Sequence, residues 1–240
     1  MKDLIALAKN NYTRRTGHTL DEIQAVLFDM DGILYDSMPG HARAWKMMCD
    51  SVGIEADENE FFAYEGRTGA DTINILYQRQ YHHAADAETC KRLYDIKADF
   101  FKSFGEPKLM PGAKDTVDLA LNKNLECVLV TGSGQASILS KLNADFGDAF
   151  SLRVTAHDVK RGKPDPEPYL TGINKANTHP SQAIAIDNAP LGVESASKAG
   201  IFTIGVITGP LKHGALLAAG ADIEVNSMAE CRLCLALLTR

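Results

Sequence analysis

The chain has 240 residues, of which 45% are hydrophobic, and this suffices to bury one large domain or a core with a smaller inserted unit. A formal net charge of −6 argues against broad attraction to nucleic acid or to an anionic membrane. The five cysteines are scattered and odd in number, which favours reduced thiols in the cytoplasm. We therefore expect a monomer whose partner is a small molecule, with no nucleic acid and no membrane involved.

The first predicted elements are a helical extension over residues 1–20 and a set of short strands. The strand segments are nearly all apolar and contain many β-branched residues, as expected for strands buried on both faces of a parallel sheet. They cover residues 25–30, 127–132, 152–156, 183–187, 202–207 and 222–225. Helical patterns lie between most of them, at 113–122, 135–146, 167–176 and 191–198. This alternation predicts an α/β fold with a doubly wound, Rossmann-like parallel sheet.

A long interval without a strand separates the first two predicted strands. It contains helical patterns instead, at residues 41–53, 70–83 and 87–104. About 70 residues are far more than a crossover requires, so this interval predicts a separate helical unit inserted into the core. We assign residues 1–37 and 108–240 to the core domain and residues 38–107 to an α-helical cap domain.

Polar or charged residues follow four of the predicted strands. In open α/β sheets ligands bind outside the carboxyl ends of the strands, so we expect these residues to share one rim. They are Asp29-Met30-Asp31-Gly32 after the first strand, Thr131-Gly132-Ser133-Gly134 after the second, Lys163 in RGKPDPEPY after the third, and Asp187-Asn188 at the end of the fourth.

These four motifs resemble those of the haloacid dehalogenase-like (HAD) superfamily of phosphotransferases, over almost the whole chain after about residue 20. The resemblance implies that Asp29 attacks phosphorus and that Asp31 shuttles the proton of the leaving group. It also implies a Mg²⁺ ion held by Asp29 and by the backbone carbonyl of Asp31. The family often has two acids at the fourth motif, and the second is usually the direct metal ligand. Here that position is Asn188, which leaves open whether Asp187, Asn188 or both contact the ion.

The chemistry of the first motif agrees with this resemblance. A carboxylate such as Asp29 can attack phosphorus and form an aspartyl-phosphate, which divides one difficult displacement into two easier ones. Because an anion then approaches another anion, a hard cation with oxygen ligands is needed, and Mg²⁺ fits best. Asp31 has to give and later take a proton, so we expect its pKa to lie above the ordinary value.

The second and third motifs are suited to holding the transferred phosphoryl group. Thr131 offers a hydroxyl, and Gly132, Ser133 and Gln135 lie where backbone N–H groups begin a helix. Lys163 would offset charge on the nucleophile and on the phosphate. The alternatives are an ordinary turn with a helix cap for the TGSG stretch and a solvated surface charge for the lysine.

Two segments of the predicted cap bear on the substrate. HARAWKMM, which begins at His41, is similar to β-phosphoglucomutase and its relatives, where this histidine positions the acid/base aspartate. EGRTG, which begins at Glu65, resembles inorganic pyrophosphatases of the same subgroup, where the glutamate helps to hold the metal and the arginine, here Arg67, binds substrate. Mutases carry an arginine where this chain has Gly69 and a lysine where it has Gly134. The alternative for Glu65 and Arg67 is a surface ion pair.

The sequence therefore predicts a Mg²⁺-dependent phosphohydrolase that acts on inorganic diphosphate or on a small phosphorylated metabolite. The second interpretation is a β-phosphoglucomutase, which HARAWK favours and which Gly69 and Gly134 disfavour. A third, from another class, is a catalytically silent binding protein with the same fold, since a fold alone does not establish chemistry. Both acids of the first motif argue against this third interpretation.

Overall fold

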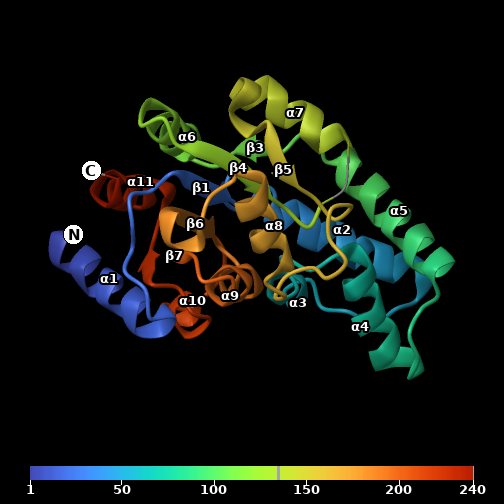
Figure 1. The fold of residues 1–240 in the computed structure, drawn as a ribbon. Coiled ribbons are helices and arrows are strands. Elements are labelled where there is room, and N and C mark those ends of the chain that lie inside the picture. Colours follow the sequence, from blue (N-terminus) through green and yellow to red (C-terminus); the bar gives the residue numbers. More distant parts are fainter. Residues whose placement is uncertain (134–135, 240) are drawn as a thin grey trace.

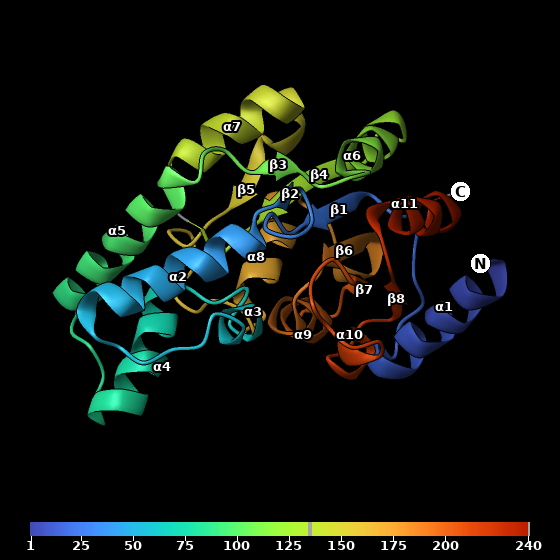
Figure 2. The ribbon, with the colours of Figure 1, turned by 180° about the vertical axis from the view of Figure 1, so that it is seen from behind.

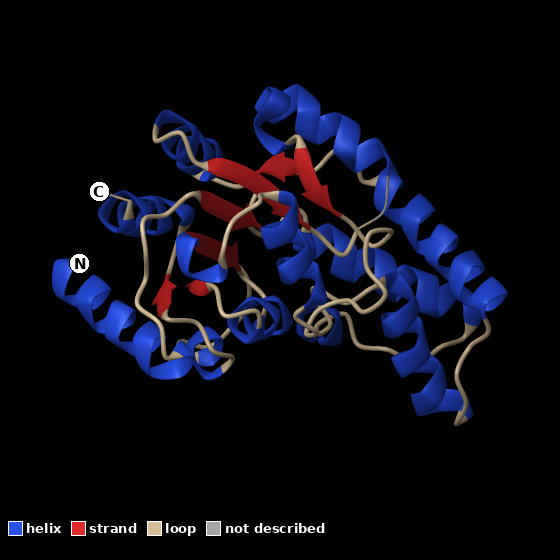
Figure 3. Cartoon of the chain, viewed as in Figure 1, coloured by secondary structure: helices blue, strands red, loops and turns tan. Residues whose placement is uncertain are grey.

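A computed structural model of the chain describes residues 1–133 and 136–239, with only the backbone described at 136–139. Within this part of the chain, six parallel strands form one sheet in the order β5-β4-β1-β6-β7-β8. The strands are β1 (Ala25–Phe28), β4 (Glu126–Val130), β5 (Leu152–Val154), β6 (Ala183–Asp187), β7 (Phe202–Val206) and β8 (Ile223–Val225). The predicted doubly wound parallel sheet is confirmed, and Figure 3 shows its strands enclosed by helices.

The sheet is buried on both faces because alternate side chains of each strand enter different apolar clusters. In β1, Val26 and Phe28 belong to one cluster, and Ala25 and Leu27 belong to the other. The opposite views of Figures 1 and 2 show the two helical layers that cover these faces. The first layer consists of α1 (Lys2–Thr16), α6 (Ala113–Asn122), α7 (Ala136–Phe146) and α11 (Met228–Leu238), and the second of α8 (Glu167–Lys175) and α9 (Pro190–Lys198).

Most of the strands end earlier than the sequence predicts. The predicted strand at 25–30 ends at Phe28, and the one at 127–132 ends at Val130. In both cases the next residue is the first of a motif, Asp29 or Thr131, and its backbone N–H still bonds to the neighbouring strand at the rim of the sheet. Further short elements connect the strands: η1 (Gly147–Phe150), η2 (Pro180–Gln182) and α10 (Ala215–Ala218).

The long interval between β1 and β4 forms a separate helical unit. Its helices are α2 (Met38–Val52), α3 (Glu60–Ala63), α4 (Gly69–Tyr81) and α5 (Ala87–Ser103), and they pack around their own apolar cluster, which includes Trp45, Leu76 and Leu93. The chain leaves the core through β2 (Tyr35–Asp36) and returns through β3 (Lys108–Leu109), which pair antiparallel. We propose that residues 38–107, at the right of the sheet in Figure 1, are the cap domain. No helix among the described residues is long and apolar enough to span a membrane.

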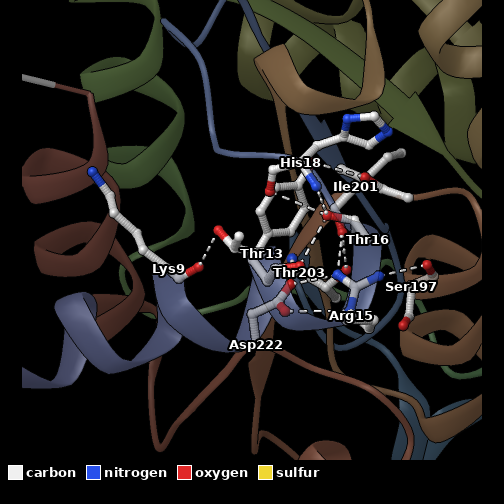
Figure 4. A network of polar contacts seen from close by, with 11 residues as sticks. Lys9, Thr13, Arg15, Thr16, His18, Ser197, Ile201, Thr203 and Asp222 are labelled. Atoms are coloured by element: carbon white, nitrogen blue, oxygen red, sulfur yellow. Dashed lines mark hydrogen bonds and ion pairs between the residues drawn. The ribbon is translucent and has the colours of Figure 1, made fainter.

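The N-terminal helix α1 is fastened to the core by a charged side chain (Figure 4). Arg15 reaches Asp222 with two hydrogen bonds, at 2.7 and 3.3 Å, and donates to the carbonyl oxygens of Ser197 and Ile201. Asp222 is buried and also accepts the backbone N–H of Thr203 at 2.9 Å. We call Arg15 and Asp222 the α1 clamp. The clamp lies at the N-terminal end of β8. The motifs lie at the opposite, C-terminal ends of the strands.

Candidate active site

Asp29 follows the last residue of the central strand β1 and is buried. Its backbone N–H donates to the carbonyl of Ile186 at 3.0 Å, which continues the pairing of β1 with β6 for one more residue. The turn after it depends on Gly32, which has a φ of 81°. A Cβ at Gly32 would lie 2.1 Å from the side chain of Asn188, so only glycine fits between the two motifs.

Lys163 links the first and the fourth motif. Its Nζ donates to Asp29 at 2.5 Å and to Asp187 at 2.7 Å, and all three side chains are buried. Burial alone would lower the pKa of Lys163, but the two carboxylates raise it well above its ordinary value. Burial raises the pKa of Asp29 to about 7 against the lowering effect of Lys163, and the nearby carboxylates of Asp187 and Asp31 add to the rise.

Both oxygens of Asp187 are committed to groups of the protein. Oδ2 accepts hydrogen bonds from Lys163 and, at 2.6 Å, from the hydroxyl of Tyr169, and Oδ1 accepts the N–H of Ala189 at 2.9 Å. Helix α9 passes very close, since a Cβ at Gly192 would lie 2.0 Å from Asp187. This carboxylate is therefore held rigidly and in turn holds Lys163.

The second motif begins at the end of β4 and lies beneath the cap. Thr131 is buried, and its backbone N–H donates to the carbonyl oxygen of Val154 on β5. Its Oγ1 accepts the backbone N–H of Ser133 at 3.0 Å. Gly132 and Ser133 line the cavity above Asp29. Gly134 and Gln135 lie outside the described residues, so the substrate-binding role of Gln135 stays a prediction.

The side chain of Asp31 is the end of a chain of hydrogen bonds that comes from the cap. His41 on α2 contacts Asp31 through Nε2 at 3.1 Å, and Lys97 on α5 contacts the Nδ1 of His41 at 2.6 Å. The ring of Phe101 stacks on His41 with 3.9 Å between the ring centroids. Because Lys97 can only donate, Nδ1 accepts and the proton of neutral His41 sits on Nε2, where it donates to Asp31.

The expected rise in the pKa of Asp31 is wrong. Burial does raise it, but His41, through its charge when protonated and through its hydrogen bond, the hydroxyl of Ser37 at 2.5 Å and the charge of Lys97 together lower it to about 2. Burial and the neighbouring Lys97 lower the pKa of His41. Burial also lowers the pKa of Lys97, to about 8. Asp31 is therefore ionised at neutral pH in this structure.

Glu65 and Arg67 both face the site from the loop before α4. Asn188 donates through Nδ2 to Glu65 at 2.8 Å, which joins the cap to the fourth motif. Burial raises the pKa of Glu65 well above its ordinary value; the Asn188 hydrogen bond lowers it, and the charges of Asp29, Asp187 and Asp31 raise it further. Arg67 lines the cavity, and its buried Nε has no hydrogen-bond partner among the described residues.

These groups surround a cavity of about 80 Å³ between the cap and the core. Ligand sites for drug-sized molecules measure about 300 to 1,000 Å³, so the cavity suits a very small substrate. Its lining includes Asp29, Asp31, His41, Glu65, Arg67 and Gly132 and also residues that the sequence reasoning missed, namely Trp45, Tyr94 and Lys97. The spacing of Lys97 from His41 carries no local pattern, and only packing of α2 against α5 brings the two together.

The oxygen atoms beside Asp29 fit a magnesium ion. Oδ1 of Asn188 is buried and accepts no hydrogen bond within the described part of the chain, so it is available as a ligand. Carboxylate and amide oxygens are the donors that Mg²⁺ prefers, and the crowding of Asp29 and Glu65 calls for a cation. Among the described residues, however, no three histidine, cysteine or acidic side chains gather as a metal centre, so amide and backbone oxygens would have to complete the shell.

A buried carboxylate beside a buried lysine, at the carboxyl end of a central parallel strand, fits an enzyme of the phosphatase and phosphotransferase kind. The family described as "Haloacid dehalogenase-like hydrolase" matches residues 26–206, and the chain belongs to this family. The resemblance seen in the four motifs is thereby confirmed.

Individual relatives agree with this assignment. The "Phosphorylated carbohydrates phosphatase" of Thermotoga maritima is 30% identical over 201 residues, which cover 83% of this chain and 92% of the relative. The "Beta-phosphoglucomutase" of Bacillus subtilis is 25% identical, over 88% and 92% of the two chains. A solved structure from Bacteroides vulgatus, provisionally described as a β-phosphoglucomutase, has a TM-score of 0.94 at 41% identity and covers 99% of this chain and 98% of its own. The likeness of EGRTG to pyrophosphatases stays a prediction.

Proposed function

We propose that the protein is a Mg²⁺-dependent phosphohydrolase that acts on inorganic diphosphate or on a small phosphorylated metabolite through an aspartyl-phosphate at Asp29. One observation carries this proposal: Asp29 and Asp31 face the same small cavity. Lys163 binds the first, and His41, which Lys97 contacts from the cap, binds the second. A protein that only binds phosphate has no use for two carboxylates of different pKa at this point.

Each side chain has a task in the proposed reaction. Asp29 attacks phosphorus, the bond between phosphorus and the leaving oxygen breaks, and Lys163 offsets the charge that gathers on the nucleophile and the phosphoryl oxygens. Thr131 and the N–H groups of Gly132 and Ser133 hold that phosphoryl group. The phosphate of diphosphate leaves as an anion, whereas the oxygen of a phosphorylated metabolite has to receive a proton, which requires protonated Asp31. In the second step Asp31 takes a proton from water, the water oxygen attacks phosphorus, and the bond between phosphorus and Asp29 breaks. Phosphate is released, Asp29 is again a carboxylate, and Asp31 returns the proton to solvent.

The proposed metal ligands are Asp29, Asn188 and the backbone carbonyl of Asp31. When bound, Mg²⁺ would neutralise charge on the nucleophile and the phosphate and so allow two anions to approach. Glu65 accepts a hydrogen bond from Asn188, and once a bound cation favours its ionised form it would supply the negative charge that the amide lacks. We assign Asp187 to holding Lys163 rather than to the ion, because its oxygens already accept hydrogen bonds from the protein.

The state of Asp31 favours diphosphate over sugar esters. An ionised Asp31 is ready to act as a base, but it cannot donate a proton to an alkoxide that leaves a sugar phosphate. Phosphate that leaves diphosphate is a stable anion and needs no such proton. A cavity of about 80 Å³ also favours the smaller substrate, diphosphate. The ring of Tyr94 occupies the space beside Gly69, where a Cβ would lie 2.2 Å from it.

The second candidate is phosphoryl transfer on hexose phosphates, and the contact of His41 with Asp31 favours it. The printed names of several relatives, among them the "Hexitol phosphatase A" of Escherichia coli, also refer to phosphorylated carbohydrates. Gly69 offers no side chain to hold a distal phosphate. We further propose that the protein is cytoplasmic, since the five cysteines are all buried free thiols, and that it is a monomer.

One assay separates the candidates. Phosphate release is measured with diphosphate, several hexose phosphates and p-nitrophenyl phosphate, with Mg²⁺ and after its removal by a chelator. We expect the highest kcat/KM with diphosphate and no release without the metal. Conversion of β-glucose 1-phosphate to glucose 6-phosphate, dependent on a bisphosphate primer, would instead identify a mutase. No reaction with any compound would leave the silent binding protein.

A further inference from the structure

The cap meets the core through backbone at positions where the core has glycine. We call residues 65–68, which precede α4, the cap loop. A Cβ at Gly132 would lie 3.2 Å from the carbonyl oxygens of Gly66 and Arg67, and a Cβ at Gly162 would lie 2.8 Å from Cγ2 of Thr68. The cap loop therefore rests on two glycines that border the catalytic residues Thr131 and Lys163.

The contact between Gly162 and Thr68 is the tighter of the two, and Thr68 cannot turn away from it. Its Oγ1 donates to the carboxylate of Asp71 at 2.7 Å and accepts the backbone N–H of Asp71 at 3.2 Å, which caps the first turn of α4. Rotation of the side chain to move the methyl group would break both hydrogen bonds. A methyl group at position 162 would consequently push the whole cap loop away from the core.

We propose that the contact of Gly162 with Thr68 is a closure contact that positions the cap loop for catalysis. The loop carries Glu65 and Arg67, and the position of Glu65 is further shown by its hydrogen bond with Asn188. The role of Gly162 and Thr68 is to position these residues, and neither touches substrate. The consequence for turnover rests on the proposed function, whereas the consequence for cap closure does not.

The first test is Gly162→Ala. Gly162 does not have a positive φ, so alanine is not strained there and the added methyl group acts only through Thr68. Because a displaced cap loop misplaces groups at the site, we expect kcat/KM for diphosphate to fall by about tenfold or more, with little change in the melting temperature. The matched control is Gly209→Ala, since a Cβ there has no atom within 4 Å and no positive φ. This control keeps the wild-type rate.

A second readout does not depend on activity. Trp45 on α2 is the only tryptophan of the sequence. Its ring packs within the cap against Phe61 and Tyr94 and also lines the cavity, so opening of the cap makes its cavity side more accessible. We expect acrylamide to quench the fluorescence of the Gly162→Ala variant more strongly than that of the wild type or of Gly209→Ala.

The decisive variant combines Gly162→Ala with Thr68→Ser. Serine keeps the hydroxyl that caps α4 and lacks the methyl group that would collide, so the double variant is expected to recover both kcat/KM and the wild-type quenching. A single variant that equals the wild type in both readouts, or a double variant that recovers neither, would overturn the proposal. If the wild type hydrolyses nothing, the proposed function fails, but the quenching series still decides whether this contact closes the cap.

Discussion

The molecule has one cluster of charged side chains at the N-terminal ends of its strands and another at their C-terminal ends, and the two clusters differ in composition. In the α1 clamp one arginine faces one carboxylate, and the remaining acceptor of Asp222 is used by a backbone N–H. At the candidate active site the acids Asp29, Asp31, Asp187 and Glu65 share two lysines, Lys163 and Lys97. The clamp is balanced without a ligand, whereas at the active site the four acids still outnumber the cations when Arg67 is added to the two lysines.

The two clusters show how a structural ion pair differs from a ligand-binding site. A balanced buried pair is costly to break, because one partner is then left charged and unpaired. Burial raises the pKa of Asp29, of Glu65 and also of Asp222, but only at Asp29 and Glu65 do neighbouring carboxylates raise it further, and a bound cation would relieve this repulsion. Substitutions in the clamp are therefore expected to change stability, and substitutions at the site are expected to change turnover.

The largest effect is expected for Asp29→Asn. An amide cannot attack phosphorus, so turnover should fall by at least about a thousandfold while the protein stays folded. Steady-state phosphate release and circular dichroism check the two halves of this expectation. Asp222→Asn is the matched control in the α1 clamp and should keep kcat while it lowers the melting temperature. Loss of turnover in the control alone would reverse the assignment of the two clusters.

Arg15→Met should be the largest change in stability. It removes the charge that faces the buried Asp222 and four hydrogen bonds, while it keeps an aliphatic side chain of similar length. We expect the free energy of unfolding, measured with urea, to drop by about 3 kcal/mol. Phosphate release at low temperature should be unchanged. A large fall in kcat with full stability would show that the clamp communicates with the site.

Lys97→Met tests the chain of hydrogen bonds that runs from Lys97 through His41 to Asp31. Loss of the donor to His41 leaves the ring free to adopt the wrong tautomer, so kcat should fall by about a hundredfold. The pKa of Lys97 is lowered to about 8, so the lysine is charged below this pH and loses its charge above it. The wild-type rate should therefore decline as pH rises through about 8, and the variant should lack this decline. Lys91→Met, at an exposed position of the same helix, is the control.

Tyr94→Ala should have the smallest effect and should change selectivity. Tyr94 lines both the small cavity and a groove of about 990 Å³ between the cap and the core, as do Gly69 and Gly132. Removal of the Tyr94 ring joins the two spaces, and we expect kcat/KM for hexose phosphates to rise about tenfold relative to diphosphate. Tyr77→Ala removes an aromatic ring from the cap outside the cavity and should leave the ratio unchanged. An unchanged ratio in both variants would remove Tyr94 from the choice of substrate.

Much of the fold, and the meeting of Asp29, Lys163 and Asp187 at one rim of the sheet, could be predicted from the sequence. Runs such as AIAID are short and apolar enough to mark buried strands, and parallel strands must bring their polar ends to one rim. The pair β2 and β3 was not predicted, because two-residue strands carry no periodicity. The contacts of Lys97 and Tyr169 depend on how helices far apart in sequence pack, and no local pattern records this.

The pKa of Asp31 shows the limit most clearly. The sequence predicts a raised pKa because Asp31 has to give and later take a proton, and burial by itself also raises the pKa of a carboxyl group. The groups that reverse this effect are Ser37, His41 and Lys97, and two of them reach Asp31 from the cap. The direction of the shift could be decided only when the positions of these three groups were known.

The most direct test of the account is to identify the residue that carries phosphorus during turnover. The enzyme is mixed with Mg²⁺ and diphosphate, quenched within the first turnover and treated with borohydride, which reduces an aspartyl-phosphate to homoserine. Peptide mass spectrometry is then expected to find homoserine at position 29, dependent on substrate and absent from Asp29→Asn. Release of phosphate without homoserine at position 29, or with homoserine at another acid, would contradict the proposed mechanism.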